Sequence, residues 1–288
     1  MTIIMSSQRS GIKIYEKNCK KIYFFVMMSC VVLPAFAFDE GFVWGLKANF
    51  NGTATIPSIN QSDLDKLGAS YMKGAVGYTM DGEAELGYLF GSERWFNHST
   101  DIFSGVSVYG SIGIGNGFTG QVAGNTVKGV TADMYININF APVVSFGVGS
   151  KAYFLNGKLS LGLWLGSKLI ADLSPSYLVY SSNPDVDAKL NKVGEIIVDD
   201  FMVKNMNPLS FSSKLFFEYH QPVNDNVEVT LSPYIRFNVY SPKYITMPHQ
   251  LLELLKQASP DFTPQTPLPS YFLNSLDFGI SMGLSFKG

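Results

Sequence analysis

Hydrophobic and polar residues alternate along most of the chain, and the alternation is clearest on both sides of Asn156-Gly157. Every second residue of the flanking segments is apolar, and the residues between them are small, polar or charged. Side chains of a β-strand point alternately to opposite faces, and Asn-Gly is the strongest two-residue signal for a hairpin turn. The pattern therefore predicts two antiparallel strands that share one apolar face.

The same period of two recurs in other segments and predicts an all-β protein. A packed core in a soluble sandwich or the lipid around a membrane barrel would each cover such a face. Residues 130–140 also alternate and would form a ninth strand. Because single-chain bacterial barrels have an even number of strands, these residues are assigned to an ordered loop or an extension of the sheet. Ten strands, with residues 68–80 forming the extra one, is the alternative. The eight predicted strands are residues 42–51, 83–90, 102–114, 144–154, 159–172, 211–220, 227–239 and 275–286.

Turn lengths predict which ends of the strands face the cell exterior. Periplasmic turns of such barrels are short and external loops are long, so residues 156–157 and 221–226 are predicted to be periplasmic. Ser62 is predicted to cap one short helical turn in the first external loop. The predicted fold is a closed eight-stranded antiparallel transmembrane β-barrel over residues 38–288. Its long extracellular loops are residues 52–80, 115–142, 173–207 and 241–272.

The N-terminal segment predicts export. Five Lys and Arg side chains precede the apolar run 22–33, and Ala35-Phe36-Ala37 places small residues where a signal peptidase cuts. This predicts a signal peptide over residues 1–37, cleaved after Ala37. A membrane anchor is the alternative, although the apolar run is shorter than the roughly 20 residues of a spanning helix. Both cysteines, Cys19 and Cys30, lie in this leader, so the exported chain is expected to form no disulfide.

Charge and motifs exclude several classes of function. The chain has 21 Lys and Arg against 23 Asp and Glu, and without the leader 16 remain against 22. The net charge near −6 predicts no binding of nucleic acid through bulk positive charge. The histidines His98, His220 and His249 lack the spacing of a metal site. The pattern Gly279-Ile-Ser281-Met-Gly283 lies in a predicted strand, whereas a serine nucleophile needs a strand-to-helix turn. We therefore expect no enzyme activity, no catalytic residue, no metal and no cofactor.

Four short motifs carry a resemblance to a known family. Glu40-Gly41-Phe42 opens the first strand, Ile56-Pro57-Ser58 lies in the first loop, Phe140-Ala141-Pro142 leads into the fourth strand, and residues 278–286 end the chain's strands. In this order the elements resemble the OmpW family of eight-stranded outer-membrane barrels. The resemblance implies a multi-pass barrel in the lipid of the cell outer membrane, with a narrow lumen that passes small hydrophobic molecules.

The resemblance also implies recognition by the barrel assembly machinery, for which Phe278 and Phe286 would form the terminal signal. Lys287-Gly288 after the last aromatic residue departs from the family pattern. The proline-rich run 260–269 fits a spirochaete better than an enteric bacterium.

The faces opposite the apolar ones predict what the lumen contains. Eight strands enclose an interior that side chains nearly fill, so charges inside should pair with opposite charges. The inward charges are then either a salt-bridged plug that stabilises the barrel or a polar constriction in a solute path. The candidate lumen-lining residues are Lys47, Glu83, Glu85, Lys151, Tyr153, Trp164, Lys168, Lys214, Glu218, Glu228, Arg236 and Asp277.

Three functions from different classes follow. The first is a porin-like barrel for passive passage of small hydrophobic molecules. The second is a surface-exposed adhesin or antigen that contacts host surface molecules from a closed barrel, and the large share of residues in loops favours it. The third is a lipid-modifying barrel enzyme, which the lack of a His and Ser constellation on the lipid face disfavours.

Overall fold

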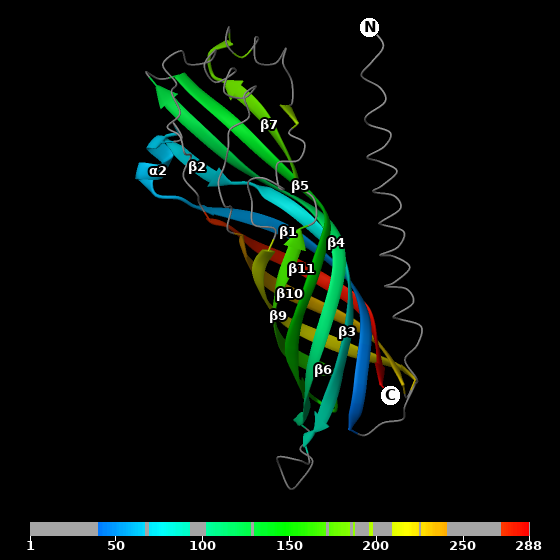
Figure 1. Cartoon of the computed structure of the whole chain (residues 1–288). Helices are drawn as coiled ribbons and strands as arrows, with labels where there is room; N and C mark the ends of the chain where they lie inside the picture. The colour runs from blue at the N-terminus through cyan, green and yellow to red at the C-terminus, as the bar shows by residue number, and fades with distance from the viewer. Residues whose placement is uncertain are drawn as a thin grey trace, which may run out of the picture.

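Eight strands form a closed ring in the computed structural model (Figure 1). The structure describes residues 40–66, 69–92, 102–127, 130–170, 173–184, 187, 196–197, 209–224, 226–240 and 272–287. The predicted signal peptide lies outside the described residues. The ring strands are β1 (Gly41–Ser58), β3 (Val76–Gly91), β4 (Phe103–Val127), β5 (Val130–Phe154), β6 (Leu159–Ile170), β9 (Leu209–Asn224), β10 (Val227–Tyr240) and β11 (Phe272–Lys287).

Antiparallel ladders join every neighbouring pair of these strands. The first strand, β1, pairs with β3 on one side and with the last strand, β11, on the other. The order then runs through β10, β9, β6 and β5, and the ladder between β5 and β4 closes the ring. The predicted all-β fold with eight barrel strands is confirmed.

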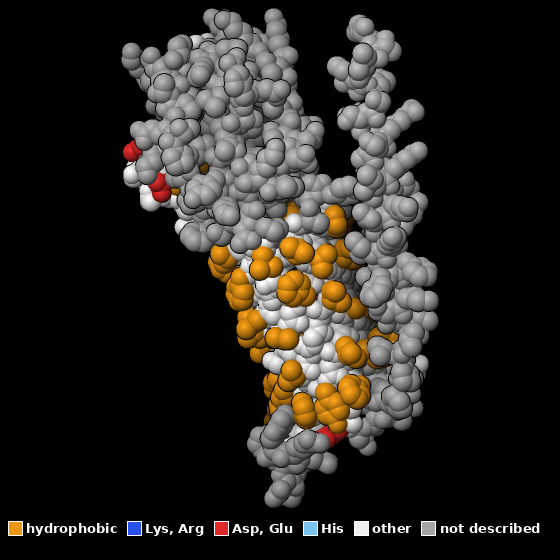
Figure 2. Space-filling model, viewed as in Figure 1, with side chains coloured by type: hydrophobic (Ala, Val, Ile, Leu, Met, Phe, Trp, Pro, Cys, Tyr) orange, Lys and Arg blue, Asp and Glu red, His pale blue; other side chains and the backbone are white. Residues whose placement is uncertain are grey.

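The outside of the ring is apolar all along the strands. Phe50, Val148, Leu163, Phe217 and Ile280 belong to five different strands, and each exposes between 44 and 63% of its surface. Figure 2 shows such side chains scattered over the face of the barrel in view, with acidic side chains only toward its two ends. Exposed apolar residues outside and buried charges inside are the arrangement of a transmembrane barrel of the outer-membrane type.

Strands β4 and β5 continue beyond the ring and carry an extension of the sheet (Figure 1). On the edge of β4 lies β2 (Tyr71–Gly74), on the edge of β5 lies β7 (Leu173–Ser181), and β8 (Ile196–Ile197) pairs with β7. Residues 115–142, predicted as one external loop, are therefore mostly strand. Most of residues 68–80 belong to β2 and β3, and β2 pairs with β4 beyond the ring instead of adding a barrel strand.

The turns differ in detail from those predicted. Leu155, Asn156 and Gly157 all have positive φ, as a tight hairpin turn through Asn-Gly requires. The predicted turn 221–226 is shorter, because the ladder continues to the pair of Asn224 with Val227.

The short helix α2 (Gln61–Lys66) lies where one helical turn was predicted. Its cap is Asn60, not Ser62: the backbone N–H of Asp63 donates to Asn60 Oδ1 at 2.9 Å. The prediction placed the cap two residues late because Asn and Ser are both good caps. No helix in the described ranges has the length and apolar character needed to span a membrane.

The sheet extension contains a tyrosine, Tyr71, whose phenol has a raised pKa. Tyr71 of β2 donates a hydrogen bond across β4 to Asp133 Oδ1 of β5, and this bond raises the pKa of Tyr71 from 10 to about 12. A raised pKa means that the folded state favours the protonated phenol, so its stabilisation is complete below about pH 10 and lost as the pH rises through about 12.

We expect Asp133→Asn to return this titration toward the ordinary value. The measurement is the ultraviolet absorbance of ionised tyrosine against pH, with Tyr71→Phe used to identify the transition. Asp65→Asn, on the exposed face of α2, is the control. An unchanged Tyr71 transition in Asp133→Asn would contradict the assigned cause.

Candidate functional site

The interior of the ring contains every residue predicted to line the lumen. All twelve are buried, with at most 8% of their surface exposed. They come from β1, β3, β5, β6, β9, β10 and β11, and all have the inward parity of their strands. Whether they line a path for a solute stays a prediction.

Four of these side chains form a closed ring of ion pairs across the lumen. Lys47 Nζ lies 2.9 Å from Glu85 Oε1 and 2.5 Å from Glu218 Oε2. Lys151 Nζ lies 2.7 Å from Glu85 Oε2 and 3.1 Å from Glu218 Oε1. Each carboxylate therefore gives one oxygen to each ammonium group, and Glu218 is wholly buried. We call these four residues the ion-pair plug.

Aromatic rings pack around the plug and were only partly predicted. Trp164 and Tyr109 form one buried cluster with Phe216 and Tyr234. The sequence analysis did not single out Phe216 and Tyr234, although both have the parity of the inward charges on their strands. Facing small residues make room for them: a Cβ on Gly162 would lie 2.1 Å from Phe216 Cζ.

A second layer of charges lies farther from the short turns that join β5 to β6 and β9 to β10. Lys214 Nζ contacts Glu83 Oε2 at 2.8 Å, and Arg236 contacts Asp81 Oδ1 at 3.3 Å. Asn49 joins the two acids by donating to Asp81 Oδ2 at 2.6 Å and to Glu83 Oε2 at 3.0 Å. The sequence analysis did not name Asp81 or Asn49 as lumen-lining residues. Residue 81 lies just before the predicted strand 83–90, whereas Asn49 has the inward parity of Lys47 in the predicted strand 42–51.

At the end of the barrel near the 155–158 turn, His220 links the plug, through Glu228, to the last strand. Its Nδ1 lies 3.0 Å from Glu228 Oε2, and its Nε2 lies 3.1 Å from Ser160 Oγ and 3.3 Å from Glu218 Oε1. Glu228 also forms an ion pair with Lys287. The unusual residue after the terminal aromatic thus belongs to the barrel's own network. Phe286 stacks on Trp44 with 3.9 Å between ring centroids, and its part in assembly stays a prediction.

The inner face of β5 changes character where the strand leaves the barrel. In the part of β5 that includes Lys151 and Ser145, the odd-numbered side chains point inward. In the part that includes Ile136, Ile138 and Phe140, the even-numbered side chains are buried. The register against β4 shifts between these two parts, so that Asn116 alone faces Ala141 and Pro142. A bulge of this kind shifts all the following side chains to the other face. The upper inner wall is therefore apolar on this side.

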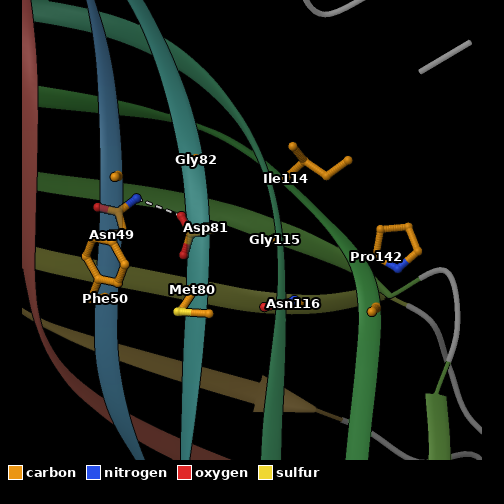
Figure 3. Close-up of a pocket in the computed structure, with 11 residues that line it drawn as sticks. Asn49, Phe50, Met80, Asp81, Gly82, Ile114, Gly115, Asn116 and Pro142 are labelled. Carbon is orange, nitrogen blue, oxygen red and sulfur yellow. Dashed lines mark hydrogen bonds between the residues drawn. The ribbon is translucent and has the colours of Figure 1, made fainter. Parts of the chain in front are cut away.

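A groove crosses the outer wall beside this bulge. It has a volume of about 550 Å³ and extends over β1, β3, β4 and β5. Figure 3 shows Asn49 and Asp81 joined by a hydrogen bond behind it, with Ile114 and Pro142 pointing away from that pair. Proline donates no backbone hydrogen bond, which weakens the wall at this point. The lining residues are Ala48, Asn49, Phe50, Met80, Asp81, Gly82, Ile114, Gly115, Asn116, Ala141 and Pro142.

A small cavity of about 20 Å³ lies beside this groove, on the lumen side of the wall. It shares four lining residues with the groove: Met80, Asp81, Gly115 and Asn116. Its inner side is lined by Lys168 and Arg236, among other residues. The groove and the cavity therefore lie on either side of the same wall residues at the bulge.

Comparisons with known proteins find similarity among solved structures alone. No family model matches the chain, and no curated protein matches its sequence. Among solved structures, the chain is similar to the outer membrane protein OprG from Pseudomonas aeruginosa, an OmpW-family member, with 10% identity over 88% of this chain and 100% of that one and a TM-score of 0.31.

Two other similar structures are surface proteins. Neisserial surface protein A has 10% identity over 85% of this chain and 97% of its own, with a TM-score of 0.28. Ail, the attachment invasion locus protein of Yersinia pestis, has 8% identity over 85% of this chain and 99% of its own, with a TM-score of 0.28. These values assign no function, and OmpW membership stays a prediction.

Proposed function

We propose that the protein passes small hydrophobic molecules through the outer membrane by a lateral path in the barrel wall. The observation that carries this proposal is the groove beside the β4 and β5 bulge, which shares its lining with a cavity open to charged lumen residues. Its volume of about 550 Å³ is within the range of small-molecule sites. A solute that reaches the bulge from inside would leave directly into lipid.

The plug supports a lateral path over an axial one. Lys47, Lys151, Glu85 and Glu218 close the lumen below the bulge with four contacts of 2.5 to 3.1 Å. An apolar molecule passing this layer would separate buried charges, and breaking such a pair costs about 3–5 kcal/mol. The lateral path avoids that cost.

The upper inner wall supports apolar cargo. Ile136, Ile138, Phe140 and Ile170 are buried there, each with at most 9% of its surface exposed. Apolar side chains above the charged layers give a hydrophobic solute a favourable surface down to the bulge. The polar layers beneath it would stop further descent.

Filling the groove tests the proposal. A Cβ on Gly82 would meet only the Lys47 carbonyl oxygen, at 4.0 Å, so Gly82→Leu should fold and occupy the groove. We expect uptake of radiolabelled octan-2-one by cells carrying the variant in their outer membrane to fall several-fold. Gly110→Leu is the matched control, because it adds the same side chain on the exposed outer face of β4, where a Cβ meets only Gly147 O at 3.9 Å.

Surface expression of both variants is compared by heat-dependent migration on a gel. Equal uptake by native protein, both variants and cells without the barrel would reject the passage proposal. The surface-interaction function would then take first place. The sheet extension favours that second function, since it presents the edge-to-face ring pair of Tyr135 and Tyr180, with 5.3 Å between ring centroids, on exposed positions beyond the ring.

A further inference from the structure

The small cavity at the bulge has an excess of hydrogen-bond donors. Lys168 and Arg236 line it and are 4% and 3% exposed. Arg236 donates from Nη1 to Asp81, but its Nε is buried without a hydrogen-bond partner. Lys168 Nζ lies 3.7 Å from Asp277 Oδ2, which is beyond hydrogen-bond distance. A buried N–H without a partner is costly. Lys168 and Arg236 could therefore each donate a further hydrogen bond.

The acids of the same layer already have donors. Asp81 accepts from Asn49 at 2.6 Å and from Arg236 at 3.3 Å. Asp277 accepts from Asn238 at 2.8 Å. Among the side chains that line this cavity, the buried polar atom without a partner is therefore a donor, Arg236 Nε, whereas the unpartnered acceptor Asn49 Oδ1 lines the outer groove.

The size of the cavity limits what can enter. Its volume of about 20 Å³ suits one water-sized group, which means a single oxygen atom of a larger molecule. The rest of that molecule would follow the shared lining of Met80, Gly115 and Asn116 into the apolar outer groove.

From this arrangement we propose a binding site for an amphiphile that places an acceptor oxygen of its head in the cavity and has a single apolar chain. Lys168 and Arg236 Nε donate to the head oxygen, and the chain lies in the groove beside Met80 and Pro142. The site rests on the proposed function only in using the lateral path, and it adds the class of solute: an alkyl carboxylate or ketone rather than an alkane or an amine.

Binding to the protein in lipid nanodiscs tests the site with three probes of equal chain length. Radiolabelled octanoate, octan-2-one and octylammonium are measured by equilibrium dialysis, with empty nanodiscs subtracted. We expect octanoate or octan-2-one to bind at least about tenfold more tightly than octylammonium, because only the two oxygen compounds accept the free hydrogen bonds. Tighter binding of octanoate than of octan-2-one would identify a charged head.

A length-matched variant locates the site. Lys168→Met removes the donor and keeps the chain, and we expect it to weaken octanoate binding about tenfold. Lys73→Met, on an exposed position of β2, is the control. The comparison of the three probes uses native protein, so it remains a test of the site even if Lys168→Met does not fold. Octylammonium binding as tight as octanoate binding would overturn the site.

The outcomes also separate this proposal from passage. Uptake of octan-2-one without any preference among the three probes rejects the head site alone. A clear preference without uptake rejects passage and leaves the binding site in place.

Discussion

Replacing Glu218 by Gln is expected to lower the free energy of unfolding by about 3–5 kcal/mol, the cost of breaking a buried ion pair. The change removes the charge that Lys47 and Lys151 share, and both ammonium groups then depend on Glu85 alone. His220 also loses its charged neighbour at 3.3 Å. The measurement is urea unfolding in lipid vesicles, monitored by heat-dependent migration on a gel.

Two further variants show whether the loss comes from unbalanced charge. Lys151→Met combined with Glu218→Gln leaves Lys47 and Glu85 paired at 2.9 Å, so most of the stability should return. Asp65→Asn also removes one acidic charge, but on the exposed face of α2, and should change little. If Glu218→Gln unfolds at the same urea concentration as Asp65→Asn, the plug does not stabilise the barrel.

Removing the bulk of the plug is expected to open an axial path. In Lys151→Ala combined with Glu218→Ala, two long side chains disappear while Lys47 and Glu85 keep each other neutral. We expect ion conductance in planar bilayers to rise clearly above that of native protein, because the plug fills the lumen of an eight-stranded barrel.

The matched control replaces Lys73 and Asp65 by alanine, which likewise removes one basic and one acidic side chain, at exposed positions outside the ring. Conductance of the plug variant equal to that of the control would mean that the aromatic cluster around Phe216 closes the lumen without the charges. Uptake through the wall groove should be the same in both variants, since the groove residues are untouched.

The alternation of residues alone determined the strands and the two faces of each strand. Because successive side chains of a strand alternate in direction, the inward placement of Lys47, Lys151, Glu218 and nine other residues needed no knowledge of their neighbours. The same rule applied to Phe216 and Tyr234 would have placed both in the lumen. Asn156-Gly157 fixed its turn because few dipeptides tolerate positive φ at both positions.

Only the tertiary structure decided which charges meet. Lys47 and Glu218 are separated by 171 residues, and their contact depends on the register of the eight ladders that close the ring. Local pattern contains no information about this register. Local pattern also could not place residues 130–140. These residues alternate whether their strand pairs inside a membrane or beyond it.

The bulge at Asn116 was beyond prediction from the sequence for a different reason. One residue of β4 faces two residues of β5 there, and this extra residue changes the parity of the strand that follows. The alternation on each side of Pro142 is regular, so the sequence shows two good strands and no defect. The wall groove lies beside this bulge because three-dimensional pairing places that extra residue opposite β4.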